Sequence, residues 1–124
     1  MLTKELSLDE TLMALSDPTR RAILKRLSSG EARVTELAQP FSMSLNAVSK
    51  HIRVLERAHL VRRRRDGREH LLSINPEPLD EVANWIVTQR RLWTARLDAL
   101  DELLKAEDRA ASKASKKKGE KHER

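Results

Sequence analysis

The spacing of apolar residues predicts four helices in the first half of the chain, because these residues recur every three or four positions. The expected bounds are 7–16, 18–27, 34–39 and 44–58. Ser7 followed by Glu10 fits a capping box at the first start, and Asp17 before Pro18 fits an N-cap with a first-turn proline. Gly30 follows the second helix and can adopt the left-handed conformation that ends many helices.

The fourth predicted helix has two chemically different faces. Val48, Ile52 and Leu55 are spaced by four and three residues, which predicts a buried face. The opposite face carries only hydrogen-bonding side chains: Asn46, Ser49, Lys50, Arg53 and Arg57. A short helix, a tight connector and a helix of this kind, capped by Ser44, form the pattern of a helix-turn-helix.

Alternation typical of strands follows on both sides of Asp66–Gly67, a dipeptide typical of a two-residue hairpin turn. With the turn at that position, Arg65 faces Arg68 and Arg63 faces His70. Five arginines surround this hairpin: Arg62, Arg63, Arg64, Arg65 and Arg68. The order of elements predicts a mainly α fold with a small β-hairpin wing, a winged helix-turn-helix.

A long last helix is expected from Leu79 to about Ala106. Its apolar seam alternates by four and three residues with one polar interruption: Leu79, Ala83, Ile86, Arg90, Trp93, Leu97, Leu100 and Leu104. The seam either packs on its own domain or meets the same seam of a second chain. We expect a homodimer, helped by Leu8 and Leu12 of the first helix, because one small domain cannot cover so long a helix. Residues 1–106 then form the DNA-binding and dimerisation domain, and 107–124 a disordered basic tail.

Composition narrows the class of partner. The net charge is +6, which favours nucleic acid or an anionic membrane surface. The only aromatic residues are Phe41, Trp85 and Trp93, too few for a row of base-stacking side chains, so duplex DNA is favoured over single strands. There is no cysteine, no long apolar run and no secretory signal, so we expect a cytoplasmic protein without disulfides. No phosphate loop, nucleophile elbow or cluster of catalytic side chains is present, so an enzyme is not expected.

The fourth helix and the wing are the candidate DNA contacts, although an exposed polar helix face can also be merely solvated, and an arginine-rich strand merely solubilising. Asn suits adenine, and Lys or Arg suits guanine, in the major groove. His51 flanks this face and is either a phosphate donor or a boundary residue with one packed ring face. The predicted contacts are Ser44, Asn46, Ser49, Lys50, His51, Arg53, Arg62, Arg64, Arg65 and Arg68.

Three segments of the chain resemble the ArsR family of bacterial winged-helix repressors: ALSDPTRRAILKRL, VTELAQPFSMSLNAVSKHIRVLERAHLV and RRDGREHLLSI. The closing NWIVTQRRLWTARLDALDELL resembles a subgroup that is not known chiefly for metals. The resemblance implies a homodimer, binding to a promoter operator, repression and often autoregulation.

Departures from the family pattern bear on the effector. Metal-sensing relatives carry a Cys-x-Cys pair where this chain has Arg33 and Thr35, and the predicted last helix has no histidine. We therefore expect no metal and no cofactor. Relatives usually have glycine where His59 stands, and if His59 keeps the positive φ it costs about 1 kcal/mol against glycine. Asn46 stands where many relatives have proline.

Three functions remain open from the sequence. The first is a sequence-specific transcriptional repressor at a palindromic promoter operator, and the second is an architectural protein that binds DNA without sequence preference. The third is an interaction module that no longer binds DNA, which the retained donors of the fourth helix disfavour.

Overall fold

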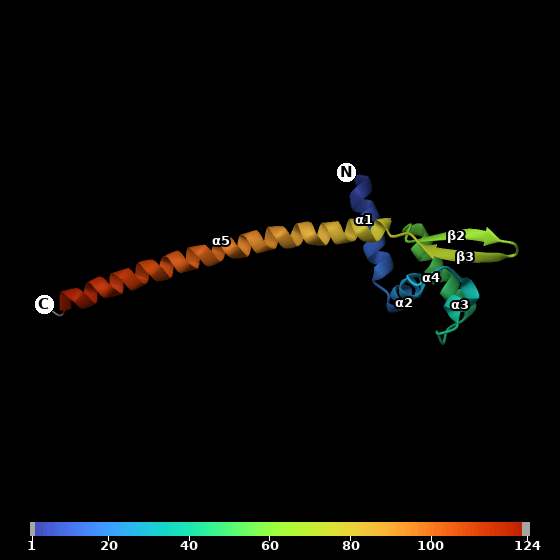
Figure 1. Cartoon of the computed structure of the whole chain (residues 1–124), viewed down its shortest axis with the longest axis horizontal. Coiled ribbons are helices and arrows are strands. Elements are labelled where there is room, and N and C mark those ends of the chain that lie inside the picture. The colour runs from blue at the N-terminus through green and yellow to red at the C-terminus, as the bar shows by residue number, and fades with distance from the viewer. Residues whose placement is uncertain (1, 123–124) are drawn as a thin grey trace. The chain divides into compact units, whose positions relative to one another are not determined.

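The structure, a computed structural model, describes residues 2–122 and the side chains of residues 7–115. It is mainly helical with one small antiparallel sheet, which confirms the predicted fold class (Figure 1). The chain divides into two compact units between Asn84 and Trp85, here called the N-terminal unit (residues 2–84) and the C-terminal segment (residues 85–122). In chain order the elements are α1 (Leu2–Leu15), α2 (Pro18–Leu27), β1 (Ala32–Arg33), α3 (Val34–Ala38), α4 (Leu45–Arg57), β2 (Val61–Asp66), β3 (Glu69–Ile74) and α5 (Glu77–His122).

Helix α1 begins at Leu2, so the predicted start at Ser7 is wrong. The residues between Leu2 and Ser7 include no proline or glycine, and leucine, lysine and glutamate predominate, so the helix has no reason to start later. Ser7 lies inside α1, where its hydroxyl donates to Oε2 of Glu81 at 3.5 Å. The serine therefore joins α1 to the first turns of α5 instead of capping a helix.

Charged and polar groups close the junction between α1 and α2. Oδ2 of Asp17 accepts a hydrogen bond from the amide of Arg20 at 3.0 Å, which confirms the predicted N-cap. The Arg20 side chain turns back to α1, where Nε donates to the Ala14 carbonyl at 2.7 Å and Nη2 to the Met13 carbonyl at 3.1 Å. The last carbonyls of a helix have no partners within it, so Arg20 satisfies α1 and holds it against the start of α2.

Helices α2, α3 and α4 share one apolar core with the sheet, and α4 packs against α1, α2, α3 and β2. The largest enclosed apolar side chains are Ile23, Leu27, Leu37, Val48, Ile52, Leu55, Leu60 and Leu72. Those of α4 were predicted to face inward. Ala22, on the neighbouring position of α2 to buried Ile23, is exposed.

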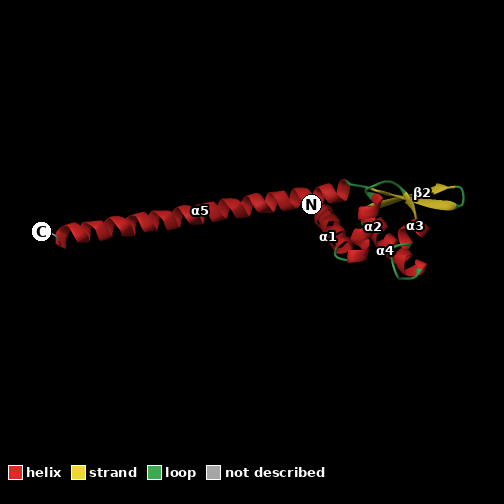
Figure 2. Ribbon diagram, turned by 60° about the horizontal axis from the view of Figure 1, so that its bottom comes forward, coloured by secondary structure: helices red, strands yellow, loops and turns green. Residues whose placement is uncertain are grey.

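The sheet has three strands in the order β1-β3-β2, whereas the sequence predicted only the hairpin. Strand β1 is two residues long, and its Ala32 and Arg33 pair with Leu72 and Leu71 of β3. A strand this short has no alternation to detect. Strands β2 and β3 extend past the helices of the N-terminal unit as a wing (Figure 2).

The hairpin turn lies one residue later than predicted. Asp66 pairs with Glu69, so the two-residue loop is Gly67–Arg68. Gly67 has φ 65, and Arg68 is not among the residues with positive φ. Glycine at the first loop position is the arrangement of a type II′ turn, whereas the predicted turn would have placed Asp66 in the left-handed region.

This shift changes which side chains face each other across the hairpin. Arg65 lies opposite His70 and Arg63 opposite Leu72, instead of the predicted Arg68 and His70. The predicted pairing is therefore wrong, and Arg68 lies in the loop itself.

Helix α5 runs from Glu77 to His122, beyond the expected end near Ala106. Alanine, lysine and glutamate are frequent in the added length and proline is absent, so helix propensity supports the extension. Disorder of residues 107–124 in solution, and a domain boundary at 106, remain predictions.

Candidate nucleic-acid interface

Helix α4 begins where the sequence places its cap. Oγ of Ser44 accepts a hydrogen bond from the amide of Ala47 at 3.1 Å. The predicted apolar face is confirmed, because Val48, Ile52 and Leu55 are each 0% exposed. Burial of this face fixes which side of α4 is turned toward solvent.

The solvent side of α4 carries Asn46, Lys50, Arg53 and Arg57, all exposed, with Ser49 half-buried beside them. Within the described part of the chain, none of these five side chains takes part in a hydrogen bond or an ion pair. The face therefore offers unpaired cationic donors and one amide, the groups that pair with base edges in the major groove.

His51 lies at the boundary of this face, where its side chain is 24% exposed. Its Nδ1 is 3.2 Å from Nη1 of Arg20 and 3.8 Å from Oδ2 of Asp17. The structure therefore supports the boundary position for the ring, whereas contact with a phosphate remains a prediction.

The contact with Arg20 also selects a tautomer of His51. A guanidinium group only donates, so a hydrogen bond at this distance requires Nδ1 to accept. Neutral His51 then carries its proton on Nε2. The imidazole of His51 can therefore pack at the boundary and still offer its Nε2–H as a donor. Arg20 links this ring to the carbonyls at the end of α1.

Asp17 completes this cluster as an anion. The hydrogen bond from the Arg20 amide lowers the pKa of the Asp17 carboxyl, and the positive charge of the Arg20 side chain lowers it further, against an opposing effect of burial. The carboxylate therefore stays ionised to a lower pH than an ordinary aspartate and keeps its cap.

The five arginines of the wing fall into two groups. Nη2 of Arg63 donates to Oε1 of Glu56 at 2.7 Å, and Nε of Arg64 donates to Oε2 of Glu31 at 2.8 Å. Each pair has a second, longer hydrogen bond, so each is bidentate. In the described residues, no ion pair involves the other three wing arginines, which are exposed: Arg62, Arg65 and Arg68.

The paired arginines attach the wing to the body of the N-terminal unit. Glu56 lies on α4 and Glu31 precedes β1, so both faces of β2 are held. The hydrogen bond to Glu31 raises the pKa of Arg64, which remains a cation. Arg64, predicted as a DNA contact, is therefore already bound within the chain and would have to leave Glu31 to reach a phosphate.

The sequence did not reveal the partners in these contacts. Glu31 and Arg64 are far apart along the chain, and the Arg20–His51 contact depends on the packing of α2 against α4. The repeated arginines predicted a cationic wing, but only the tertiary structure distinguishes the paired arginines from the unpaired ones.

The residues predicted for a dimer interface also fall into two groups. Leu8 is half-buried, and so is Leu79, which packs against the core of its own unit. Leu12 on α1 is 41% exposed. On α5 the exposed predicted residues are Ile86, Trp93, Leu97, Leu100 and Leu104.

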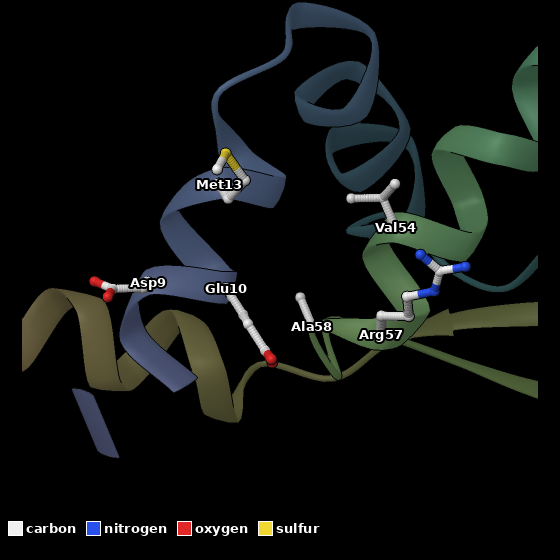
Figure 3. A pocket seen from close by; sticks show the side chains of 6 residues that line it. All are labelled: Asp9, Glu10, Met13, Val54, Arg57 and Ala58. Carbon is white, nitrogen blue, oxygen red and sulfur yellow. The ribbon is translucent and has the colours of Figure 1, made fainter. Parts of the chain in front are cut away.

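A pocket of about 310 Å³ lies between α1 and α4. Met13, Val54 and Ala58 supply its apolar surface, while Asp9 points away from α4 and Glu10 toward Ala58 (Figure 3). Among the described residues, no three side chains of the metal-binding types gather into a site. None of the described helices has a segment long and apolar enough to cross a membrane.

Comparison with known proteins gives consistent matches. A family model described as a helix-turn-helix domain matches residues 15–64. The HTH-type transcriptional regulator Rv2034 of Mycobacterium tuberculosis is 37% identical over 99 residues, which cover 80% of this chain and 90% of that protein. The transcriptional repressor SdpR of Bacillus subtilis is 31% identical over 64% of this chain and 89% of its own length.

Solved structures match at similar coverage. The ArsR family transcriptional regulator RHA00566 is 43% identical with a TM-score of 0.70, over 73% of this chain and 93% of that one. The homodimeric winged helix-turn-helix DNA-binding domain of Mb0332 from Mycobacterium bovis is 26% identical with a TM-score of 0.55, over 69% and 82%. The matched relatives are transcriptional regulators, not enzymes.

Proposed function

This chain belongs to the ArsR family of winged helix-turn-helix transcriptional regulators, and we propose that it is a dimeric repressor that binds a palindromic promoter operator and regulates its own gene. The observation that carries the proposal is the unpaired solvent face of α4, whose opposite face is completely buried.

Asn46, Lys50 and Arg53 read base edges in this proposal, with Ser49 beside them. A bidentate contact from such a side chain discriminates against a wrong base by about 1–3 kcal/mol. His51 donates from Nε2 to a phosphate, since Nδ1 is occupied by Arg20. Ser44, at the helix N-terminus, lies where backbone amides favour an anion.

The wing contacts the backbone beside the operator half-site. Arg62, Arg65 and Arg68 have no partner among the described residues, so they can bind phosphates or enter a narrow minor groove. Arg64 is a weaker candidate because Glu31 already binds it. Arg63 has the same structural role through Glu56.

The dimer forms through the exposed apolar side chains of the C-terminal segment. Trp93 and Leu97 are 61% and 66% exposed, and Leu12 of α1 adds a further apolar side chain. Support comes from Mb0332, a relative described as homodimeric. Two copies of α4 would then read half-sites about one helical turn apart, which requires a palindrome.

Selection of DNA from a random pool at physiological salt tests the function. We expect a palindromic motif, bound at least about 10³-fold more tightly than unrelated DNA, and a match to it in the promoter of the protein's own gene. A ratio below about ten would instead indicate the architectural function, which the lysine-rich end of α5 would also suit.

A further inference from the structure

A second cavity, of about 380 Å³ and open to solvent on one side, lies between α2 and α3. Ile23 and Leu37, two almost fully buried core residues, line it, and Phe41 and Pro40 border it from the connector that leads to α4. Its volume is at the lower end of the range for small-molecule sites. The cavity is therefore large enough for a small organic molecule.

The charge at this cavity has one sign. Lys25 and Arg26 line it, and no acidic side chain of the described residues does. Arg26 is engaged within the chain, because its guanidinium lies 3.5 Å from Glu36 and donates to the Gly30 carbonyl at 3.3 Å. The Lys25 ammonium has no hydrogen bond or ion pair among the described residues. An apolar surface with one available ammonium group suits an anion that carries an apolar body.

We propose that this cavity binds a small apolar carboxylate, whose anionic head pairs with Lys25 and whose apolar body contacts Ile23, Leu37 and Phe41. This inference rests on the proposed function, since it assigns the ligand that regulates operator binding. It differs from metal sensing because it needs neither cysteine nor a cluster of histidines.

The location of the cavity explains how a bound carboxylate would change DNA binding. Phe41 lies in the connector between α3 and α4, and its amide donates to the Ala38 carbonyl at 3.1 Å. A carboxylate that displaces the Phe41 ring moves this connector and hence the start of α4, which carries Asn46. Binding of carboxylate and operator are then mutually unfavourable by the same factor.

The binding experiment uses the full chain and the straight-chain carboxylates from hexanoate to dodecanoate, each beside the alcohol of equal chain length. We expect amide NMR shifts at Ile23, Leu37 and Phe41 with the carboxylate of best length. Lys25→Met should weaken that carboxylate about tenfold or more and leave the weak binding of the alcohol unchanged. Ala22→Leu, which fills the cavity from its exposed edge, should abolish both.

Met13→Ala, in the pocket between α1 and α4, is the matched control and should bind the carboxylate as the wild type does (Figure 3). Absence of shifts with every chain length, shifts confined to α1 and α4, or equal carboxylate affinity in Lys25→Met would each overturn the site.

Operator affinity is measured separately, first without any carboxylate. Saturating carboxylate should weaken operator binding at least about fivefold in the wild type and not in Ala22→Leu. If the protein binds no operator even without carboxylate, the proposed function fails, whereas the NMR result decides the carboxylate site independently. Carboxylate binding at Lys25 with unchanged operator affinity would overturn the regulatory role alone.

Discussion

The two units of the chain contain the same kinds of apolar residue in opposite environments. In the N-terminal unit, leucine, isoleucine and valine form an enclosed core in which Ile52 and Leu55 are inaccessible to solvent. In the C-terminal segment, the large apolar side chains from Trp85 to Leu104 are 45% to 66% exposed. The first unit buries most of its large apolar side chains within itself, although Leu12, Met13 and Leu45 stay exposed. The second unit exposes a continuous series of them, which only another surface can cover.

Replacing one leucine with alanine in each unit should show the largest difference in stability between the two environments. Leu55→Ala should lower the free energy of unfolding by about 2–5 kcal/mol, because it leaves a cavity in a packed core. Leu97→Ala should change it by less than about 0.5 kcal/mol in dilute protein, and by more only where the dimer is populated. Urea titrations at two protein concentrations measure both. An equal loss for Leu97→Ala at both concentrations would mean that the segment packs on its own unit.

Charge placed on the exposed seam should break the dimer and leave the N-terminal unit folded. In the double variant Leu97→Glu and Leu100→Glu, we expect monomers by light scattering and an operator affinity about 10²-fold lower or worse, because two linked half-site contacts become one. The control is Arg91→Glu at an exposed polar position of α5, which lowers the net charge by the same amount. A double variant that stays dimeric would exclude this seam as the interface.

The wing shows the same contrast among charged side chains. Arg65 has no partner in the described residues, whereas Arg64 is held by Glu31. Arg65→Ala should reduce the slope of log affinity against log salt by about one unit, and Arg64→Ala by clearly less. Glu31→Gln should release Arg64 and make the slope steeper. Identical slopes for the two alanine variants would show that the pair with Glu31 does not persist on DNA.

Asp17 is a hydrogen-bonded carboxylate whose contribution to folding stability depends on pH. Its folded pKa lies below the ordinary value, so its stabilisation is present above the unfolded pKa and is lost as pH falls through the folded pKa. At neutral pH Asp17→Ala should lower stability by about 1 kcal/mol, and the deficit should shrink below about pH 4. Asp17→Asn, which keeps the cap without the charge, should lose only the pH-dependent part. Thermal unfolding of the wild type and both variants across this pH range measures the deficit. A stability deficit of Asp17→Ala that does not change with pH would contradict the prediction.

Local signals allowed much of the N-terminal unit to be predicted. The caps at Asp17 and Ser44 and the buried face of α4 follow from residues within one or two turns of each other. The hairpin was placed one residue off, because sequence cannot tell whether Gly67 occupies the first or the second loop position. Strand β1 escaped prediction because only its pairing with β3 defines it.

The sequence predicted which elements form the candidate site, but not the contacts of each side chain in it. The donors of α4 other than half-buried Ser49 are exposed as expected, because the period of its apolar face determines the opposite face. The separation of Arg64 from Arg65 depends on Glu31, and the orientation of His51 depends on Arg20, both distant in sequence. Long-range ion pairs leave no periodic signal, so they appear only in the folded chain.

The smallest expected change in stability concerns His59, whose backbone is hydrogen-bonded but has an unfavourable φ. His59 follows α4 with φ 60. Its amide donates to the Glu56 carbonyl, and the amide of Leu60 donates to the Leu55 carbonyl. This is the Schellman arrangement, in which glycine is the usual residue because a side chain is strained there. His59→Gly should therefore raise the free energy of unfolding by about 1 kcal/mol or slightly less, since glycine also gains freedom when unfolded.

Operator affinity should stay unchanged in His59→Gly, because the exposed imidazole lies outside the proposed interface. His59→Ala is the matched control: it removes the same imidazole but keeps a Cβ in the left-handed region, so it should not stabilise the protein. Denaturant unfolding of the three proteins decides between backbone strain and side-chain loss. Stabilisation by alanine equal to that by glycine would assign the effect to the histidine side chain instead of to φ.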